Sequence, residues 1–141
     1  IILGEVRGEE VLDVLQAMNT GHDGSMSTVH ANNTRDALVR LEMLASLANF
    51  RGGADVIREM ISSALDLIVH VSRFSDGKRR ITSIAEVTGY RDGQFMLNEL
   101  FTYDTQQERH ISQNVRPANP KFATAPLLER SDGGINRSWD R

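Results

Sequence analysis

Apolar side chains recur with helical spacing through the first half of the chain. Val11, Val14, Leu15 and Met18 stand three or four residues apart, which predicts an amphipathic helix over residues 9–19. Two further stripes of the same kind follow, so three helices are expected before residue 66. The second stripe consists of Leu38, Leu41, Ala45 and Ala48, and the third consists of Val56, Ile57, Met60, Ile61, Ala64 and Leu65.

Polar and glycine residues mark where the second and third helices begin. Asn32, Asn33 and Thr34 offer side-chain oxygens that can cap the first amides of the second helix. The pair Gly52-Gly53 then breaks the helical pattern before the third stripe starts. The second and third helices are therefore expected to be separate elements.

The remaining apolar segments have the alternation or the β-branched composition of strands. Two turn dipeptides, Asp76-Gly77 and Asp92-Gly93, separate the later segments and predict β-hairpins. The expected strands comprise residues 1–3, 27–30, 66–74, 81–87 and 95–103. This order predicts an α/β fold: a mainly parallel sheet flanked by helices, with antiparallel hairpin strands added at its edge.

Composition divides the chain near Asp104. Residues 1–104 carry 15 acidic and 10 basic side chains, whereas residues 105–141 carry 4 acidic and 6 basic ones and all three prolines. We therefore expect a folded part over residues 1–104 and a polar, loosely ordered tail over residues 105–141.

The overall composition excludes several classes of protein. A formal net charge of −3 argues against non-specific nucleic-acid binding, which needs a basic excess. The absence of cysteine excludes disulfides, a thiol nucleophile and cysteine-bound zinc. No apolar run approaches the roughly 20 residues that span a bilayer. Because the chain opens with Ile1 inside an apolar run, we expect it to be a piece of a longer polypeptide.

Glu5 is the first residue with candidate chemistry. It follows the apolar strand of residues 1–3, and ligands of open α/β sheets bind beyond the carboxyl ends of the strands. A carboxylate there can hold a magnesium-bound water or orient an attacking water. The alternative is a surface glutamate in a strand-to-helix loop that caps the following helix.

Two histidines bracket the second expected strand. His30 falls at its carboxyl end, where an imidazole can contact a terminal phosphate or shuttle a proton. The alternatives are a structural strand-end histidine at position 30 and a polar loop residue at His22. A metal-dependent hydrolase would need His22, Asp23 and His30 to bind a metal tightly together. Metal-dependent phosphohydrolases place such His-Asp pairs on helices, and Gly21 and Gly24 argue against a helix here. We therefore expect no metal bound by this chain.

Three segments carry the residues of a known set of motifs. They are Gly4–Gly8, Thr20–His22 and Ser27–Asn32, and Ala37 and Arg40-Leu41 add to the likeness. Together they resemble the type II and type IV secretion ATPases, the hexameric motors of secretion systems and type IV pili. The run Leu15–Ser25 is most similar to the branch that serves tight-adherence (Flp-type) pilus assembly. The resemblance covers residues 1–104.

This resemblance implies a RecA-like P-loop NTPase fold and a role for each matching residue. Glu5 matches the catalytic acid of the family's Walker B segment, and Arg7 matches the arginine after it, with a structural or sensor role. Residues 20–32 match the histidine box, which His22 opens and in which His30 contacts the γ-phosphate. The implied ligands are ATP and Mg²⁺, and the implied assembly is a homo-hexamer.

One motif of that family is missing from the 141 residues. A P-loop needs Gly-x-x-x-x-Gly-Lys followed by Ser or Thr, and no stretch of the chain fits. The chain therefore resembles the C-terminal half of the motor, with ATP and Mg²⁺ bound mainly by the missing N-terminal half. Alone, it should hydrolyse little or no ATP.

Two functions from different classes follow. The first is a cytoplasmic ATPase at the inner membrane that powers pilus assembly or secretion through platform proteins, without direct nucleic-acid contact. The alternative is a non-catalytic interaction module that binds a membrane platform protein or a neighbouring subunit. Adding the missing N-terminal half separates them, since only the motor would then gain ATPase activity.

Overall fold

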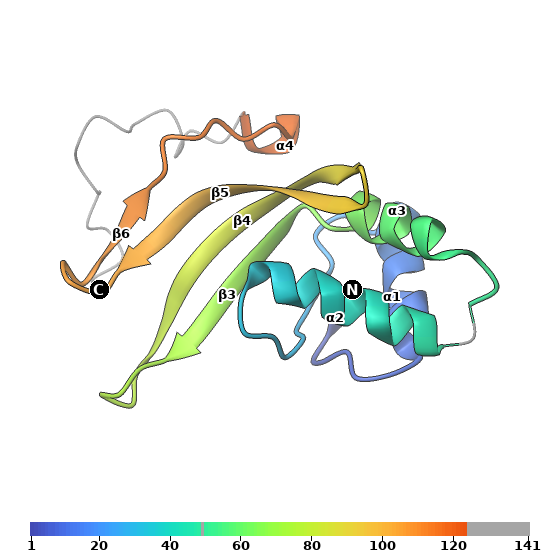
Figure 1. Cartoon of the computed structure of the whole chain (residues 1–141), viewed down its shortest axis with the longest axis horizontal. Helices are drawn as coiled ribbons and strands as arrows, with labels where there is room; N and C mark the ends of the chain where they lie inside the picture. Colours follow the sequence, from blue (N-terminus) through green and yellow to red (C-terminus); the bar gives the residue numbers. More distant parts are fainter. Residues whose placement is uncertain (49, 124–141) are drawn as a thin grey trace.

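The computed structural model describes residues 1–48 and 50–123, which form three helices packed against one end of a long antiparallel sheet (Figure 1). No helix within these residues is long and apolar enough to cross a bilayer. In chain order the elements are β1 (Ile2–Leu3), α1 (Glu10–Asn19), β2 (Met26–Ser27), α2 (Thr34–Leu47), α3 (Ala54–Ala64), β3 (Leu67–Arg73), β4 (Arg79–Arg91), β5 (Gln94–Asp104), β6 (Arg109–Ser112) and α4 (Pro120–Ala123).

Two sheets make up the strand part of the described chain. β1 and β2 pair in parallel, with Ile2 opposite Met26 and Leu3 opposite Ser27. The other sheet is antiparallel and has the strand order β3-β4-β5-β6. The predicted α/β class, with parallel strands plus antiparallel hairpins, is confirmed. In this part of the chain, however, the antiparallel sheet has four strands and the parallel one only two.

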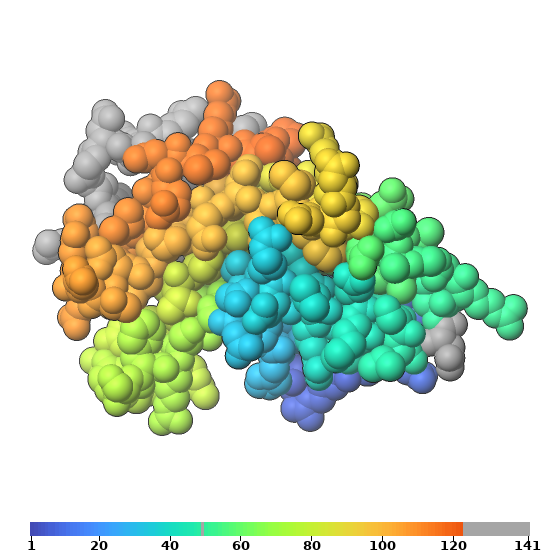
Figure 2. Space-filling view, in the orientation of Figure 1, coloured from blue at the N-terminus to red at the C-terminus, as the bar shows by residue number. Residues whose placement is uncertain are grey.

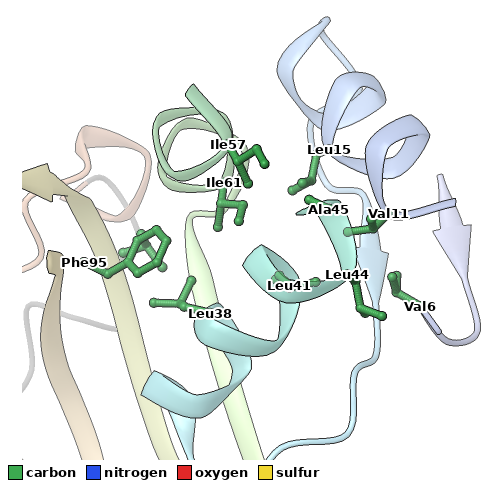
Figure 3. Close-up of a cluster of buried hydrophobic side chains, with 11 residues drawn as sticks. Val6, Val11, Leu15, Leu38, Leu41, Leu44, Ala45, Ile57, Ile61 and Phe95 are labelled. Atoms are coloured by element: carbon green, nitrogen blue, oxygen red, sulfur yellow. The ribbon is translucent and has the colours of Figure 1, made fainter. Parts of the chain in front are cut away.

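The apolar faces of the three helices meet the sheet in one core. Figure 3 shows Phe95 of β5 pointing toward Leu38 of α2, with Ile57 and Ile61 of α3 above them. Burial of such side chains supplies the main driving force for this packing. The predicted stripes are confirmed except at Val56, whose side chain is 51% exposed because it lies beside the buried face of α3. The most deeply buried apolar residues are Val11, Leu15, Leu38, Ala45, Ile61 and Ala85.

The predicted helix-capping and turn residues lie where the sequence places them. Asn33 caps α2, since its side-chain oxygen accepts a hydrogen bond of 2.8 Å from the amide of Asp36. Gly77 and Gly93 lie in the two predicted hairpin turns with φ of 82° and 79°, a region that favours glycine. These local rules therefore set the start of α2 and the register of both hairpins.

The tip of the β3–β4 hairpin is held by an ion pair. The Arg80 guanidinium lies 2.7 Å from Asp76, and it stacks over Phe74 at 5.0 Å and Tyr103 at 5.9 Å. The hydrogen bond from Arg80 is the main cause that lowers the pKa of Asp76 to about 2, and the Lys78 amide adds to it. Asp76 therefore stays ionised, and its pair with Arg80 persists, in mildly acidic solution.

A buried glutamate organises the segment after β6. Glu86 of β4 is fully buried, and its carboxylate accepts hydrogen bonds from the amides of Ala118 at 2.9 Å and Asn119 at 2.6 Å. The side chain of Asn98 adds a third at 3.1 Å. These bonds satisfy a charge that would otherwise be costly to bury. In Figures 1 and 2 the segment that ends in α4, coloured orange, runs back along the sheet toward the helices.

The sheet continues past the expected boundary at Asp104. β6 pairs with β5, with Thr102 opposite Ile111 and Asp104 opposite Arg109. The polar residues that follow Asp104 therefore form an exposed edge strand, and after it the segment that Glu86 holds in place. The remainder of the expected tail, residues 124–141, lies outside the described residues.

Replacement of Ile61 by alanine should lower the free energy of unfolding by about 2–5 kcal/mol, because the side chain is fully buried and its loss leaves a cavity. Urea denaturation of the two proteins measures the difference. Val56→Ala on the same helix is the matched control and should change stability by less than about 0.5 kcal/mol, as exposed positions do. A loss below about 1 kcal/mol for Ile61→Ala would contradict the core assignment.

Candidate functional site

The candidate site lies where β1 and β2 end side by side. Because the two strands are parallel, the residues that follow them leave the sheet at the same edge. The amide of Val6 donates to the carbonyl oxygen of Thr28 at 2.8 Å, and the Thr28 hydroxyl donates to the carbonyl oxygen of Gly4 at 2.5 Å. These bonds extend the pairing beyond the strands and bring the segment of Glu5 beside that of His30.

Glu5, Arg7 and His30 form one cluster at this edge. Nε2 of His30 lies 3.0 Å from Oε1 of Glu5, and the Arg7 guanidinium contacts Oε2 of the same carboxylate. The Glu5 side chain is 21% exposed, whereas those of Arg7 and His30 are 77% and 89% exposed. The carboxylate is thus partly enclosed, and its two partners face solvent. The structure places three of the four predicted site residues together.

Arg7 sets the charge state of the carboxylate. The hydrogen bond from Arg7 is the main cause that lowers the pKa of Glu5. Partial burial opposes this effect, and the positive charges of Arg7 and His30 add to it. Glu5 in turn raises the pKa of Arg7. Glu5 is therefore a carboxylate at neutral pH, the form that can accept a proton or a hydrogen bond from water.

Glu10 fixes the loop that carries Arg7. Its Oε1 accepts hydrogen bonds from the amides of Arg7 at 2.6 Å and Gly8 at 3.0 Å. The hydrogen bond from the Arg7 amide is the main cause that lowers the pKa of Glu10, and its own amide and that of Gly8 contribute. Sequence analysis did not select Glu10. An acid in the first turn of a helix is the one signal that pointed to it.

His22 lies at the opposite end of β2 from His30. It precedes the strand, beside Ser25, whose hydroxyl contacts the amino group of Ile1 at 3.2 Å. Nδ1 of His22 lies 3.0 Å from the carbonyl oxygen of Ala17. The two predicted histidines therefore lie at different ends of the same short strand, and His30 is the one of the two that contacts Glu5.

This separation also bears on the metal-dependent hydrolase. That hypothesis needs His22, Asp23 and His30 to meet at one ion, but His30 lies beyond the far end of β2. Asp23 instead faces an ammonium group: Nζ of Lys121 lies 3.2 Å from Asp23 and 3.5 Å from Asp66. No group of three or more potential metal-binding side chains occurs in the part of the chain that the structure describes.

The arrangement of Glu5, Arg7 and His30 suits a reaction in which water attacks a charged group. A carboxylate can orient water, and an exposed guanidinium and imidazole can donate to an anion. All three groups stand where parallel α/β sheets bind their ligands. The fold and the site thus define an α/β protein with an acid–histidine pair at the carboxyl edge of its parallel strands.

The chain belongs to the family described as type II/IV secretion system protein, whose model matches residues 1–123. It is 40% identical over 95 residues to the conjugal transfer protein TrbB of Rhizobium radiobacter, which covers 67% of this chain and 28% of that protein. It is 34% identical over 101 residues to the type IV secretion system protein PtlH of Bordetella pertussis, which covers 66% of this chain and 27% of that protein.

A solved structure shares the fold. The VirB11 ATPase of the Brucella suis type IV secretion system, crystallised with sulphate, superposes with a TM-score of 0.57 at 28% identity. The match covers 61% of this chain and 27% of that one. The chain thus spans about a quarter of the length of the relatives that it matches.

Replacement of Arg7 by alanine should raise the pKa of Glu5 toward its ordinary value near 4.5, because the main cause of the lowering is removed. A carboxyl ¹³C NMR titration of wild type and variant measures the shift. Arg91→Ala at the end of β4 is the control and should leave the Glu5 titration unchanged.

The same substitution should also change how stability depends on pH. Because folding lowers the pKa of Glu5, the Glu5–Arg7 pair stabilises the protein above the ordinary value, and this contribution disappears as the pH falls through the lowered one. The difference in stability between wild type and Arg7→Ala should therefore be largest near neutral pH and shrink in acid. A difference that grows in acid would contradict the assignment.

Proposed function

We propose that this chain is the C-terminal part of an ATPase that powers type II/IV secretion or pilus assembly. The observation that carries the proposal is the contact between Glu5 and His30 at the carboxyl ends of neighbouring parallel strands. Membership of the secretion family and the likeness to a solved ATPase support it. Within this enzyme, Glu5 would act on the attacking water and His30 would contact the terminal phosphate.

The site residues fit a bound phosphate. Arg7 and His30 are largely exposed donors beside an ionised carboxylate, so a phosphate oxygen can reach both donors from solvent. The sulphate bound by the Brucella suis relative is a tetrahedral anion of the same kind. Without a P-loop in the 141 residues, most contacts to the phosphates would come from sequence outside this chain.

Catalysis would depend on position and charge, as in phosphoryl transfer generally. Glu5 would accept a hydrogen bond from the attacking water through a lone pair that its contacts with His30 and Arg7 leave free. His30 would donate to a γ-phosphate oxygen, and Arg7 would hold the carboxylate in its ionised form. Mg²⁺ would neutralise charge on the phosphates, and residues outside this chain would supply most of its ligands.

Exposed strand edges support the inference that more of the sheet comes from elsewhere. In the described residues, β2 pairs only with β1, and β3 pairs only with β4. Both carry exposed apolar side chains: Met26 is 61% exposed, and Val69 and Val71 are 49% and 50% exposed. The loop before β2 and the start of β3 also line a cavity of about 110 Å³. Apolar strand edges are normally covered, so we infer that further strands of the ATPase domain occupy them.

Within the secretion ATPase family, we propose that the protein belongs to the branch that serves tight-adherence (Flp-type) pilus assembly. The run Leu15–Ser25, across the end of α1 and the following loop, supports this branch. The whole protein would be a homo-hexamer on the cytoplasmic side of the inner membrane and would act on platform proteins there. Loss of pili from the host when the gene carries an inactivating substitution would test the branch.

In the full-length enzyme, Glu5→Gln should reduce turnover about 100-fold to 10,000-fold and leave ATP binding intact, because the amide keeps the shape and loses the charge. Steady-state ATPase assays and nucleotide titrations measure the two effects. Glu9→Gln, at the exposed residue before α1, is the control and should keep wild-type turnover. If Glu5→Gln turns over within a few-fold of wild type, Glu5 is not catalytic. If the wild-type full-length protein has no ATPase activity, the interaction module replaces the motor.

His30→Ala in the full-length hexamer should spare ADP binding, reduce ATPase activity sharply and bring the ATP-bound and ADP-bound conformations closer together. A ligand shifts a conformational equilibrium only through its different affinity for the two states, and this substitution removes the discriminating contact. Hydrogen exchange with each nucleotide measures the conformational difference, and the melting temperature tests for a structural effect. An unchanged difference between the ATP and ADP forms, with a lowered melting temperature, would assign His30 a structural role.

A further inference from the structure

Lys121 of α4 joins three segments that are far apart in sequence. Its ammonium lies 3.2 Å from Oδ1 of Asp23, in the loop between α1 and β2, and 3.5 Å from Oδ2 of Asp66, which precedes β3. The pKa of Lys121 is raised, mainly by the hydrogen bond to Asp23 and also by the charge of Asp66. Two carboxylates and one ammonium thus meet beside the cavity that His22 and Ser25 line.

The position of Lys121 does not depend on this exposed ion pair. Exposed pairs contribute little to stability by themselves, and the side chains of Lys121 and Asp23 are 50% and 76% exposed. The segment before Lys121 is instead fixed by the buried carboxylate of Glu86, which accepts the amides of Ala118 and Asn119. The side chain of Asn119 also donates to Asp66 at 2.7 Å. The backbone around residue 119 is therefore held in place independently of the contact between Lys121 and Asp23.

The loop that Asp23 occupies leads directly into β2. The amide of Ser25 donates to the carbonyl oxygen of His22 at 3.3 Å, and the amide of Met26 donates to that of Ile1 at 2.9 Å. β2 has only two residues, and His30 lies three residues beyond its end. A restraint on Asp23 thus acts on the same short segment that carries His30 to Glu5.

We propose that Lys121 is a positioning residue for the histidine-containing segment of residues 20–32. It holds the loop before β2 against the C-terminal segment and thereby limits movement of the strand that leads to His30. Its effect on catalysis rests on the function proposed above, whereas its effect on the loop does not. The chain has only two lysines, so Lys78 at the β3–β4 hairpin provides a matched comparison.

The first test is hydrogen exchange at the amides of Ser25 and Met26 in the 141-residue chain. Lys121→Met keeps a side chain of similar length without charge and should speed exchange about two-fold to five-fold, the range that loss of one exposed pair supports. Lys121→Arg keeps a charge that reaches both carboxylates and should restore slow exchange. Lys78→Met should match wild type. Two results would overturn the proposal. The first is an exchange rate in Lys121→Met within 1.5-fold of wild type, which corresponds to a free-energy change of only about 0.2 kcal/mol. The second is an equal increase of the exchange rate in Lys78→Met.

A spectroscopic test does not depend on the loop amides. Reductive ¹³C-methylation labels both lysines, and the signals are assigned with Lys121→Arg and Lys78→Arg. Asp23→Asn should lower the titration midpoint of Lys121, because it removes the charged acceptor whose hydrogen bond is the main cause of the raised pKa. A midpoint of Lys121 that stays unchanged in Asp23→Asn would mean that the pair does not form in solution.

The catalytic consequence is measured in the full-length enzyme. Lys121→Met should lower kcat several-fold with KM for ATP unchanged, and Lys121→Arg should recover kcat, because the residue acts through the position of His30 and not on the nucleotide. A KM effect without a kcat effect would overturn the positioning role. If Glu5→Gln keeps full activity, the proposed function fails, but the exchange and titration results still decide the role of Lys121 in the loop.

Discussion

Parallel pairing of β1 with β2 is the constraint on which the candidate site depends. Only two residue pairs form this ladder, yet they decide which ends of the two strands coincide. Glu5 and His30 come from segments 25 residues apart in the chain and meet because each follows its strand in the same direction. Antiparallel pairing would place His22 beside Glu5 instead. The direction of one short strand therefore selects which histidine serves the carboxylate.

A second constraint comes from Glu86 of β4. Its carboxylate is fully buried, and three donors compensate its charge. Two of those donors are backbone amides, which orient the chain more strictly than a side-chain contact would. The segment that leads to α4 is consequently part of the fold, and its lysine reaches the loop before β2. This loop therefore connects the C-terminal segment to the strand that leads to His30.

Much of this fold could be predicted because local rules decide it. The stripes of α1 and α2, the Asn33 cap and the two Asp-Gly hairpins depend on residues a few positions apart, and all appear where expected. The grouping of Glu5 with His30 also follows from strand order. The separation of His22 from His30 could be predicted as well, because the two histidines bracket the short strand, although the resemblance groups them in one motif.

Interactions between distant residues left no comparable signal in the sequence. Nothing in the sequence distinguishes the buried Glu86 from the exposed glutamates, because its partners lie 32 and 33 residues further on. The composition after Asp104 suggested a loose tail, because edge strands and polar segments fixed by backbone hydrogen bonds need few apolar residues. Lys121 was unremarkable for the same reason, since only the folded chain shows which carboxylates it faces.

The two contacts of the Glu5 carboxylate have a consequence for its strength as a base. Each oxygen already accepts one contact, from Arg7 or from His30, so both donors draw electron density from the carboxylate and weaken it as a base toward water. If Glu5 acts as proposed, a γ-phosphate that takes over the hydrogen bond of His30 or Arg7 would leave the carboxylate a stronger base. Activation of water would then depend on the presence of the γ-phosphate.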